Sequence, residues 1–203
     1  DHTCAILDDG SVKCWGYGVY GVLGNGYTSS RSTPSSPLNF GTNRSAVSIS
    51  AGHQHSCAVL DNGDVKCWGR NHVGQLGNNG TTDKSTPTST SPLGNGRTAI
   101  GVLSGYKHSC AILDDASMSC WGSNQGNQLG YTNTPTSNNN IPTPITTLGA
   151  NRTIGISERD FDGDGILNIF ESTAPSLVTC NSGQYGFFVC LDSPAGKFVN
   201  SGG

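Results

Sequence analysis

Oxygen-bearing side chains alternate along one short segment in the last quarter of the chain. Over twelve residues they stand at the first, third, fifth, ninth and twelfth places, with a glycine at the sixth and a free backbone carbonyl at the seventh. A hard cation such as Ca²⁺ takes six or more oxygen ligands, and a tight loop with this spacing supplies them. The spacing predicts a calcium site, and an acidic turn without metal is the alternative. The predicted ligands are Asp160, Asp162, Asp164, the carbonyl of Ile166, Asn168 and Glu171.

Cysteine is the other residue type whose spacing points to chemistry. The 8 cysteines form four pairs, each with a separation of ten residues. In the first pair, Asp8-Asp9-Gly10 suits a three-residue hairpin loop that closes on a glycine in the left-handed conformation. That loop length sets Cys4 opposite Cys14 across an antiparallel pair, close enough for a disulfide. The predicted disulfides are Cys4–Cys14, Cys57–Cys67, Cys110–Cys120 and, by the shared spacing, Cys180–Cys190.

The number of cysteines indicates where the protein works. Paired cysteines at this density are typical of an oxidising compartment, so we expect an extracellular or cell-surface protein. The alternative is a set of zinc sites that use His2, His55 and His108. Two cysteines and one histidine per site leave tetrahedral zinc one ligand short.

The third hairpin carries Ala116 where a glycine is wanted, so its turn is expected to be strained or different.

Composition excludes two classes of partner. The net charge of −3 gives no basic footprint for nucleic acid. No apolar run approaches the roughly 20 residues that span a bilayer, so we expect no membrane insertion in this segment.

The chain begins at Asp1 with neither an initiator Met nor a signal peptide, which we interpret as processing, cutting or partial capture. Asn43, Asn79 and Asn151 begin Asn-x-Ser/Thr sequons and are candidate glycosylation sites.

Three repeats of 53 residues position the first six cysteines. The segment 2–8 returns at 55–61 and again at 108–114, and a Cys-Trp-Gly triplet and a Leu-Gly pair follow in register each time. The 29 glycines and the many Ser, Thr and Asn residues read as turn chemistry in an all-β fold. We expect the repeated tryptophans to pack between repeats and the repeated histidines to hydrogen-bond backbone within their own repeat. The tryptophans are Trp15, Trp68 and Trp121.

The second repeat resembles a known family. Its segment 55–78, which reads His-Ser-Cys-Ala-Val-Leu-Asp-Asn-Gly-Asp-Val-Lys-Cys-Trp-Gly and onward to Leu-Gly-Asn, closely resembles the regulator-of-chromosome-condensation repeat in its Cys-bearing extracellular version. The resemblance covers roughly residues 1–157 and implies a β-propeller in which each repeat supplies one four-stranded blade. Asn127 replaces the Gly74 of the second repeat, so one loop is expected to differ. Nucleotide exchange and chromatin binding are not implied, because the chain lacks basic tails.

The phase of the repeats determines how the blades are assembled. A similar strand precedes the second hairpin at 44–50 and the third at 97–102, and it returns at 152–157 after the third repeat. The sequence therefore predicts three complete blades in permuted order. The strand at 152–157 closes either the first blade of its own chain or that of a neighbouring molecule.

The whole chain divides into three predicted parts. They are the propeller repeats (1–157), the calcium loop (158–172) and a short Cys-rich extension (173–203). The calcium loop resembles both the EF-hand and the thrombospondin type 3 repeat, and the strand before it favours the second. The extension resembles the Cys-rich repeats of growth-factor-receptor-like extracellular modules.

The inventory of reactive groups argues against an enzyme. Three of the 5 histidines occupy one repeated position, and no nucleophile elbow, phosphate loop or zinc-protease motif is present.

Two non-enzymatic hypotheses remain. The first is a structural subunit that binds other copies of itself and forms a filament or surface layer. The second is an adhesive propeller of a larger secreted or cell-surface protein, which binds a protein or glycan ligand through its loops. The unequal termini favour the first.

Overall fold

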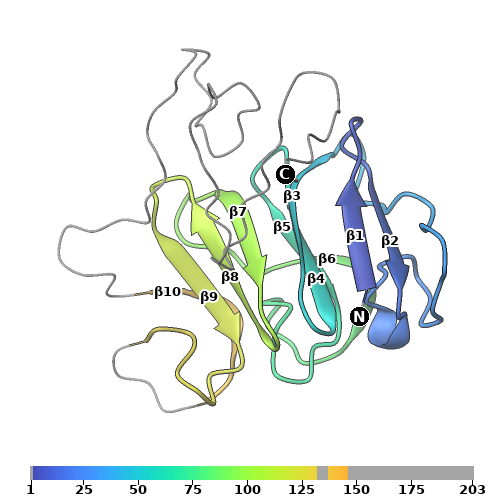
Figure 1. Ribbon diagram of the computed structural model, residues 1–203. Helices are drawn as coiled ribbons and strands as arrows, with labels where there is room; N and C mark the ends of the chain where they lie inside the picture. Colours follow the sequence, from blue (N-terminus) through green and yellow to red (C-terminus); the bar gives the residue numbers. More distant parts are fainter. Residues whose placement is uncertain (1, 132–136, 146–203) are drawn as a thin grey trace, which may run out of the picture. The chain divides into compact units, whose positions relative to one another are not determined.

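Antiparallel β-sheets form the described part of the chain, which the computed structural model places at residues 2–131 and 137–145. All of these residues belong to one compact unit, Asp1–Ile154. Three sheets follow one another along the sequence, and Figure 1 shows them side by side. This part contains no helix with the length and apolar character of a membrane span. The predicted all-β propeller architecture is confirmed.

The first blade contains two strands, β1 (His2–Ile6) and β2 (Val12–Gly16), which pair antiparallel with Cys4 opposite Cys14. A short 3-10 turn, η1 (Val19–Gly21), follows β2. The next segment runs back along β2 without forming a regular strand. The Gly16–Arg31 bridge and a hydrogen bond from the Leu38 N–H to the Val12 carbonyl (2.9 Å) hold it there.

The second and third blades are complete four-stranded sheets. The second has the order β3-β4-β5-β6 and the third has the order β7-β8-β9-β10, with antiparallel pairing throughout. The strands of the second blade are β3 (Ala46–Ala51), β4 (His55–Leu60), β5 (Val65–Gly69) and β6 (Lys84–Ser89). Those of the third blade are β7 (Ala99–Ser104), β8 (His108–Leu113), β9 (Met118–Gly122) and β10 (Asn139–Pro144).

The permuted order of strands is confirmed for these two blades, because β3 and β7 precede their hairpins and pair with them. The predicted strand at 152–157 lies outside the described residues. How the first blade is completed therefore stays a prediction.

The hairpin turns have one geometry in all three repeats. Residues Gly10, Gly63 and Ala116 take φ values of 74°, 78° and 61°. Each N–H bonds to the carbonyl three residues earlier, at 2.9 Å for Ala116 and 2.8 Å for Gly63. The expectation of a different third turn is therefore wrong in shape, although Ala116 does stand in the left-handed region that disfavours a side chain.

The second loop that was expected to differ also keeps its shape. Asn127 has φ 58° where Gly74 has φ 81°. The Asn127 N–H bonds to the Asn124 carbonyl at 3.0 Å, as the Gly74 N–H bonds to the Asn71 carbonyl at 2.9 Å. Asparagine tolerates the left-handed conformation better than other side chains, so this replacement leaves the loop unchanged.

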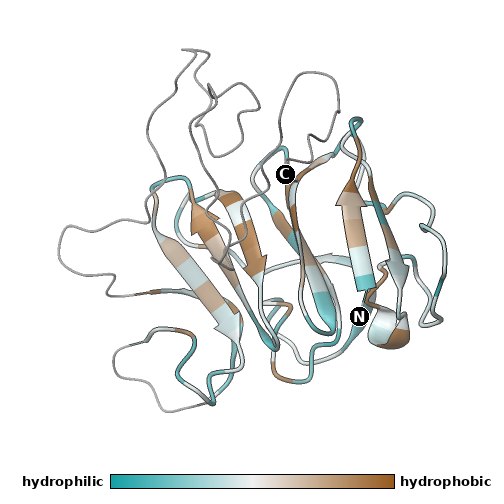
Figure 2. Cartoon of the chain, in the orientation of Figure 1, coloured by the Kyte–Doolittle hydropathy of each residue, from teal (hydrophilic) through white to brown (hydrophobic). Residues whose placement is uncertain are grey.

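Most of the described core lies between blades, and a smaller cluster of Cys110, Cys120 and Leu129 lies within the third blade. Figure 2 shows apolar residues along the strands and polar residues concentrated in the loops. One cluster joins the first blade to the second, and another joins the second to the third. The first includes Val12, Cys14, Leu23, Leu38, Ala58, Leu60 and Trp68. The second includes Cys57, Val65, Leu76, Leu93, Ala111, Leu113 and Trp121. The predicted packing of the tryptophans between repeats is confirmed for Trp68 and Trp121.

Candidate functional site

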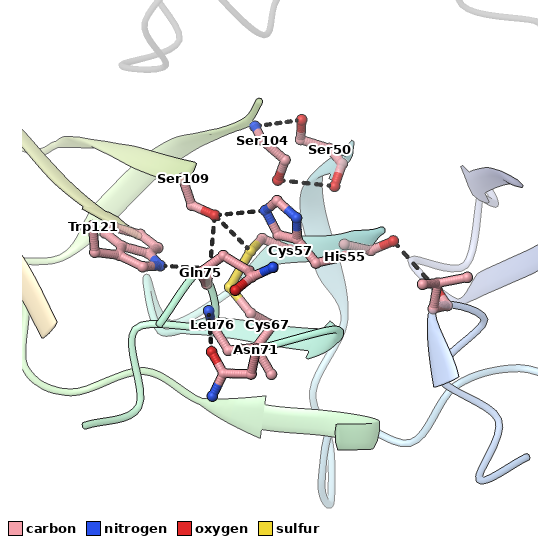
Figure 3. The surroundings of a disulfide bond; sticks show 12 residues. Ser50, His55, Cys57, Cys67, Asn71, Gln75, Leu76, Ser104, Ser109 and Trp121 are labelled. Atoms are coloured by element: carbon pink, nitrogen blue, oxygen red, sulfur yellow. Dashed lines mark hydrogen bonds between the residues drawn. A yellow bond between two sulfur atoms is a disulfide. The ribbon is translucent and has the colours of Figure 1, made fainter. Parts of the chain in front are cut away.

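The repeated polar residues meet at the joints between blades, and Figure 3 shows the joint between the second and the third. His55 reaches from the second blade to the hydroxyl of Ser109 in the third, with 2.8 Å between Nε2 and Oγ. The Ser109 hydroxyl donates to the carbonyl of Gln75 at 2.9 Å. The Trp121 indole N–H donates to that same carbonyl at 2.9 Å. One histidine and one carbonyl of a blade thus hold a serine and a tryptophan of the next.

The first joint repeats this arrangement. The His2 Nε2 lies 2.6 Å from the Ser56 Oγ, and the Trp68 N–H donates to the Val22 carbonyl at 2.9 Å. Our expectation that each repeated histidine bonds backbone within its own blade is therefore wrong. The histidine instead binds a serine side chain 54 residues further along the chain.

The hydrogen bonds fix the proton on one nitrogen of His55. The Ser109 hydroxyl has a single proton and gives it to a carbonyl, so the imidazole must donate from Nε2. The Nδ1 atom is then unprotonated, and it is buried with no hydrogen-bond partner in the described structure. Burial lowers the pKa of His55 to about 3 and that of His2 to about 4. Both imidazoles are neutral at physiological pH.

Disulfides of the first and second blades lie beside these contacts. Cys57–Cys67 bridges the hairpin of the second blade, and its sulfur is 3.7 Å from the Ser109 Oγ. The other two bridges that the structure contains are Cys4–Cys14 and Cys110–Cys120. These are the pairs that the hairpin register predicts. Because each sulfur is bonded to another, these cysteines are not zinc ligands, and residues 2–131 and 137–145 contain no other cluster fit to hold a metal.

Loops from neighbouring blades form a second candidate site, which we call the loop face. The Arg70 guanidinium lies 4.5 Å from the Tyr20 ring centroid and donates to the Gln54 Oε1 at 2.5 Å. Next to Gln54, the His53 ring stacks on Tyr106 with 4.2 Å between centroids. The loop face consists of Tyr20, His53, Gln54, Arg70, Tyr106 and Lys107.

The loop face presents one exposed aromatic ring, that of Tyr106, and the partly exposed cations Arg70 and Lys107. Tyr106 is 61% exposed, and the Lys107 ammonium is 5.5 Å from the centroid of its ring. Cation–π pairs of this kind hold the cation over the face of the ring. Tyrosine and arginine are the residues that contribute most to protein–protein binding. The arrangement therefore suits recognition of an acidic surface and provides no group for covalent chemistry.

The hairpin turns at the other end of the strands carry the opposite charge. Three surface ion pairs neutralise part of it: Arg44–Asp61 (3.4 Å), Arg97–Asp114 (3.5 Å) and Arg97–Asp115 (3.1 Å). Exposed pairs of this kind contribute little stability. The acidic side chains in the three turns are Asp8, Asp9, Asp61, Asp114 and Asp115.

Several predicted site residues lie outside the described part of the chain. These are the six calcium ligands from Asp160 to Glu171, the pair Cys180 and Cys190, and the sequon residue Asn151. The other two sequon residues, Asn43 and Asn79, are exposed and have φ values of 53° and 58°. Sequence reasoning missed Ser56 and Ser109 as partners of the histidines, although a hydroxyl residue recurs at this place in every repeat.

The sheets follow one another as blades, and Trp68 and Trp121 each donate to a carbonyl of the preceding blade. This arrangement defines a β-propeller of repeated units. The family model of the regulator of chromosome condensation (RCC1) repeat matches residues 9–59, 62–112 and 119–157. A second model of the same repeat matches 46–75 and 100–128. The chain belongs to this family.

Relatives of known sequence include the ultraviolet-B receptor UVR8 of Arabidopsis thaliana. It is 34% identical over 131 residues, which cover 64% of this chain and 29% of that receptor. The probable E3 ubiquitin-protein ligase HERC4 of Homo sapiens is 34% identical over 133 residues, which cover 66% of this chain and 12% of the ligase. This chain therefore spans less than a third of either relative.

Solved structures show the same fold. Yeast RCC1 (Prp20), bound to Kap60, matches with a TM-score of 0.64 and 22% identity over 73% of this chain and 36% of its own. Human WBSCR16 matches with a TM-score of 0.64 and 24% identity over 73% of this chain and 38% of its own. At this level of identity the likeness establishes the propeller fold alone.

Proposed function

We propose that this chain is a non-catalytic segment of an extracellular β-propeller that binds a protein partner through the loop face. The observation that carries the proposal is the contiguous set of rings and cations from Tyr20 to Lys107, drawn from three successive repeats. Prp20p of Saccharomyces cerevisiae, which has the same fold, has binding properties toward Gsp1p and histones. Propellers of this family thus include protein-binding members.

The use of the repeated polar residues supports a non-catalytic role. His55 and Ser109 are 0% exposed, and both are engaged in joining blades. A general base must reach its substrate, and an imidazole sealed between two blades does not. Partly exposed cations of the described loops, such as Arg70 and Lys107, suit binding.

The disulfides support an extracellular location. All three bridges of the described residues lie within the repeated hairpins, where each closes a ten-residue separation. Such bridges persist in oxidising compartments and are reduced in the cytosol. A location outside the cell or at its surface is therefore the proposal that fits the covalent structure.

The proposed function is tested by substituting loop-face residues and measuring whether the chain still binds its partner. The wild-type chain, immobilised and exposed to extracellular fluid of the source organism, should retain a protein that the Arg70→Ala/Tyr106→Ala variant releases. The matched control is Arg44→Ala/Arg97→Ala, which removes two cations from the turn end. The retained protein is then purified, and its dissociation constant should rise by about tenfold or more in the loop-face variant alone. Equal retention by all three chains would contradict the proposal.

We also propose that Asp160, Asp162, Asp164, Ile166, Asn168 and Glu171 bind one calcium ion. Extracellular loops of this type bind weakly, on the order of 10⁻⁴–10⁻³ M. Titration calorimetry should detect calcium heat in the full chain and none in Glu171→Ala, which lacks the bidentate ligand. Heat of the same size in both chains, or in neither, would refute the site.

Self-assembly into a filament or surface layer is the second candidate function. It is supported by the first blade, whose described residues form only two regular strands, so that a strand from another copy would extend this sheet. Donation of the strand at 152–157 between copies, as the sequence predicts, lies outside the described residues and stays a prediction.

A further inference from the structure

Asparagine stands directly before glycine at four places in the sequence. The four asparagines are Asn25, Asn62, Asn79 and Asn95. Because glycine has no Cβ, its backbone nitrogen approaches the side-chain amide of the preceding asparagine with little steric hindrance. The nitrogen can then attack that amide, provided that the glycine N–H is free and the two residues are able to rotate. The surroundings of each Asn-Gly pair therefore decide whether it reacts.

The first pair is held by hydrogen bonds on both of the groups that would react. The Gly26 N–H donates to the Ser85 carbonyl at 2.8 Å. The Asn25 Oδ1 accepts from the Tyr27 N–H at 3.1 Å. The attacking nitrogen and the amide under attack are both engaged, so the folded chain protects Asn25.

The second pair is protected in the same way, because it lies in a hairpin turn. The Gly63 N–H donates to the Leu60 carbonyl at 2.8 Å. The Asn62 Oδ1 accepts from the Asp64 N–H at 3.2 Å, and the Asn62 Nδ2 donates to the Asp64 carboxylate at 2.8 Å. Reaction at Asn62 would require the turn to open.

The third pair is held by its backbone. The Asn79 N–H donates to the Asn140 carbonyl at 2.9 Å, and the Gly80 carbonyl accepts from the Asn71 Nδ2 at 3.0 Å. The Gly80 N–H has no hydrogen-bond partner among the described residues. The nitrogen is therefore free, but rotation of the pair breaks the bonds on either side of it.

The fourth pair has none of these restraints. Asn95 and Gly96 are both exposed, and neither has a hydrogen-bond partner within residues 2–131 and 137–145. A Cβ placed on Gly96 would meet nothing within 4 Å, so the space for rotation is open. The bond that spans the pair, from the Arg97 N–H to the Gly94 carbonyl, is long at 3.5 Å. Of the four pairs, this one combines a free nitrogen with a free amide.

We infer that Asn95 is a deamidation site, at which the folded chain converts itself to aspartate and isoaspartate without an enzyme. The Gly96 backbone nitrogen gives its proton to solvent and attacks the Asn95 Cγ. The new N–Cγ bond closes a five-membered succinimide ring. The Cγ–Nδ2 bond breaks with its electron pair on nitrogen, which takes a proton from solvent and leaves as ammonia.

Water then opens the succinimide ring. Addition of water at Cγ breaks the new bond to the Gly96 nitrogen and leaves an aspartate in the original chain. Addition at the backbone carbonyl carbon of residue 95 breaks the original peptide bond instead, so that the chain runs through Cγ as isoaspartate. In both cases the Gly96 nitrogen regains its proton, one water is consumed, and the amide is replaced by a carboxylate.

The new carboxylate lies at the end of the strands that carries the acidic turns. Residue 95 is two positions before Arg97, whose guanidinium pairs with Asp114 at 3.5 Å and with Asp115 at 3.1 Å. A further carboxylate beside this cation makes the turn end more acidic as the molecule ages. This change is independent of partner binding at the loop face.

Peptide mapping of the oxidised full chain after incubation at neutral pH tests the site. Trypsin cleaves after lysine and arginine, so the four pairs fall in four different peptides, 14–31, 45–66, 71–84 and 85–97. Mass spectrometry should find the amide-to-acid mass change first in peptide 85–97, with an isoaspartate product that isoaspartyl methyltransferase labels. Asn95 should convert about tenfold or more faster than Asn25 and Asn62, whose hydrogen bonds must first be lost by local opening. Asn79 should convert at an intermediate rate.

Unfolding the chain provides the control for sequence alone. In the reduced chain in urea, native hydrogen bonds are absent and all four peptides should convert at similar rates. Gly96→Ala, which adds a Cβ next to the attacking nitrogen in open space, should slow the conversion of Asn95 in the folded chain. The inference is overturned if peptide 14–31 or 45–66 converts as fast as 85–97 in the folded chain. It is equally overturned if wild-type peptide 85–97 keeps its amide as long as the Gly96→Ala peptide does.

Discussion

At some positions of this protein the backbone takes a conformation that only certain residue types adopt easily. The left-handed turn position is the clearest example, because it recurs as Gly10, Gly63 and Ala116 with φ between 61° and 78°. The two glycines meet the demand without cost. Ala116 meets it with a side chain, so the third hairpin contains local strain that the other two lack.

Replacing that alanine by glycine should stabilise the chain. An L-residue in the left-handed conformation costs about 1–2 kcal/mol of folding free energy, which glycine would relieve. The greater freedom of glycine in the unfolded chain offsets about 0.4–1 kcal/mol of that gain. Ala116→Gly should therefore raise the free energy of unfolding by about 0.5–1 kcal/mol, measured from urea unfolding midpoints.

The opposite change in the second hairpin is the matched control. Gly63→Ala would place a Cβ 2.4 Å from the Thr98 Cβ, in addition to the left-handed strain. It should lower stability by more than Ala116→Gly raises it. Equal midpoints for wild type and Ala116→Gly would show that the third turn is not strained.

At the scale of elements, the blade joint is the unit that repeats. In the joint between the second and third blades, the neutral His55 imidazole connects the two sheets, and its buried Nδ1 has no hydrogen-bond partner among the described residues. Adding a proton there would bury an unpaired charge, which explains why burial lowers the pKa of His55. The joint is therefore sensitive to acid.

Acid should lower the free energy of unfolding, because the unfolded chain binds protons at its histidines more readily than the folded chain does. The unfolded histidines take up a proton near their ordinary pKa of about 6.5, whereas the folded pKa is about 4 for His2 and about 3 for His55. The stabilisation is complete above pH 6.5 and is lost as pH falls toward these folded values. Each histidine should cost about 1.4 kcal/mol per pH unit in that window.

His55→Gln tests this assignment, because glutamine has no proton to gain and still offers an N–H to Ser109. Urea unfolding between pH 7.5 and 4.5 should show a shallower loss of stability for this variant than for wild type. Val47→Gln, at a side chain that is 48% exposed and has no titratable group, is the control and should keep the wild-type slope. If His55→Gln kept it too, the acid sensitivity would lie elsewhere.

The hairpins were predictable in detail, and the joints were not. Loop length alone fixes an antiparallel register, so Cys4 opposite Cys14 followed from the turn residues. The partner of each histidine depends instead on how one sheet packs on the next. His55 and Ser109 are 54 residues apart, and no local pattern in either segment indicates that they meet. The repeated hydroxyl at this place was a signal that only the packing of blades could explain.

At the scale of the whole molecule, stability comes from contacts between neighbours. Each blade buries its apolar face against the next, as in other repeat proteins. The described blades all belong to the unit Asp1–Ile154, which is compact by itself. The charge is also divided, with carboxylates in the hairpin turns and cations with aromatic rings on the loop face. A partner that approaches from either end of the strands therefore meets a surface of one dominant sign.

Truncation tests whether the strand predicted at 152–157 joins copies of the chain. A chain ending at residue 150 lacks that strand, the calcium loop and the Cys-rich extension, and it keeps the three described disulfides. If strand donation drives association, the truncated chain should stay monomeric in sedimentation velocity at concentrations at which the full chain associates, while its unfolding midpoint is unchanged. Linking a separate 151–203 peptide to the truncated chain should then restore association. Association of the truncated chain equal to that of the full chain would instead place the contacts on the blades themselves.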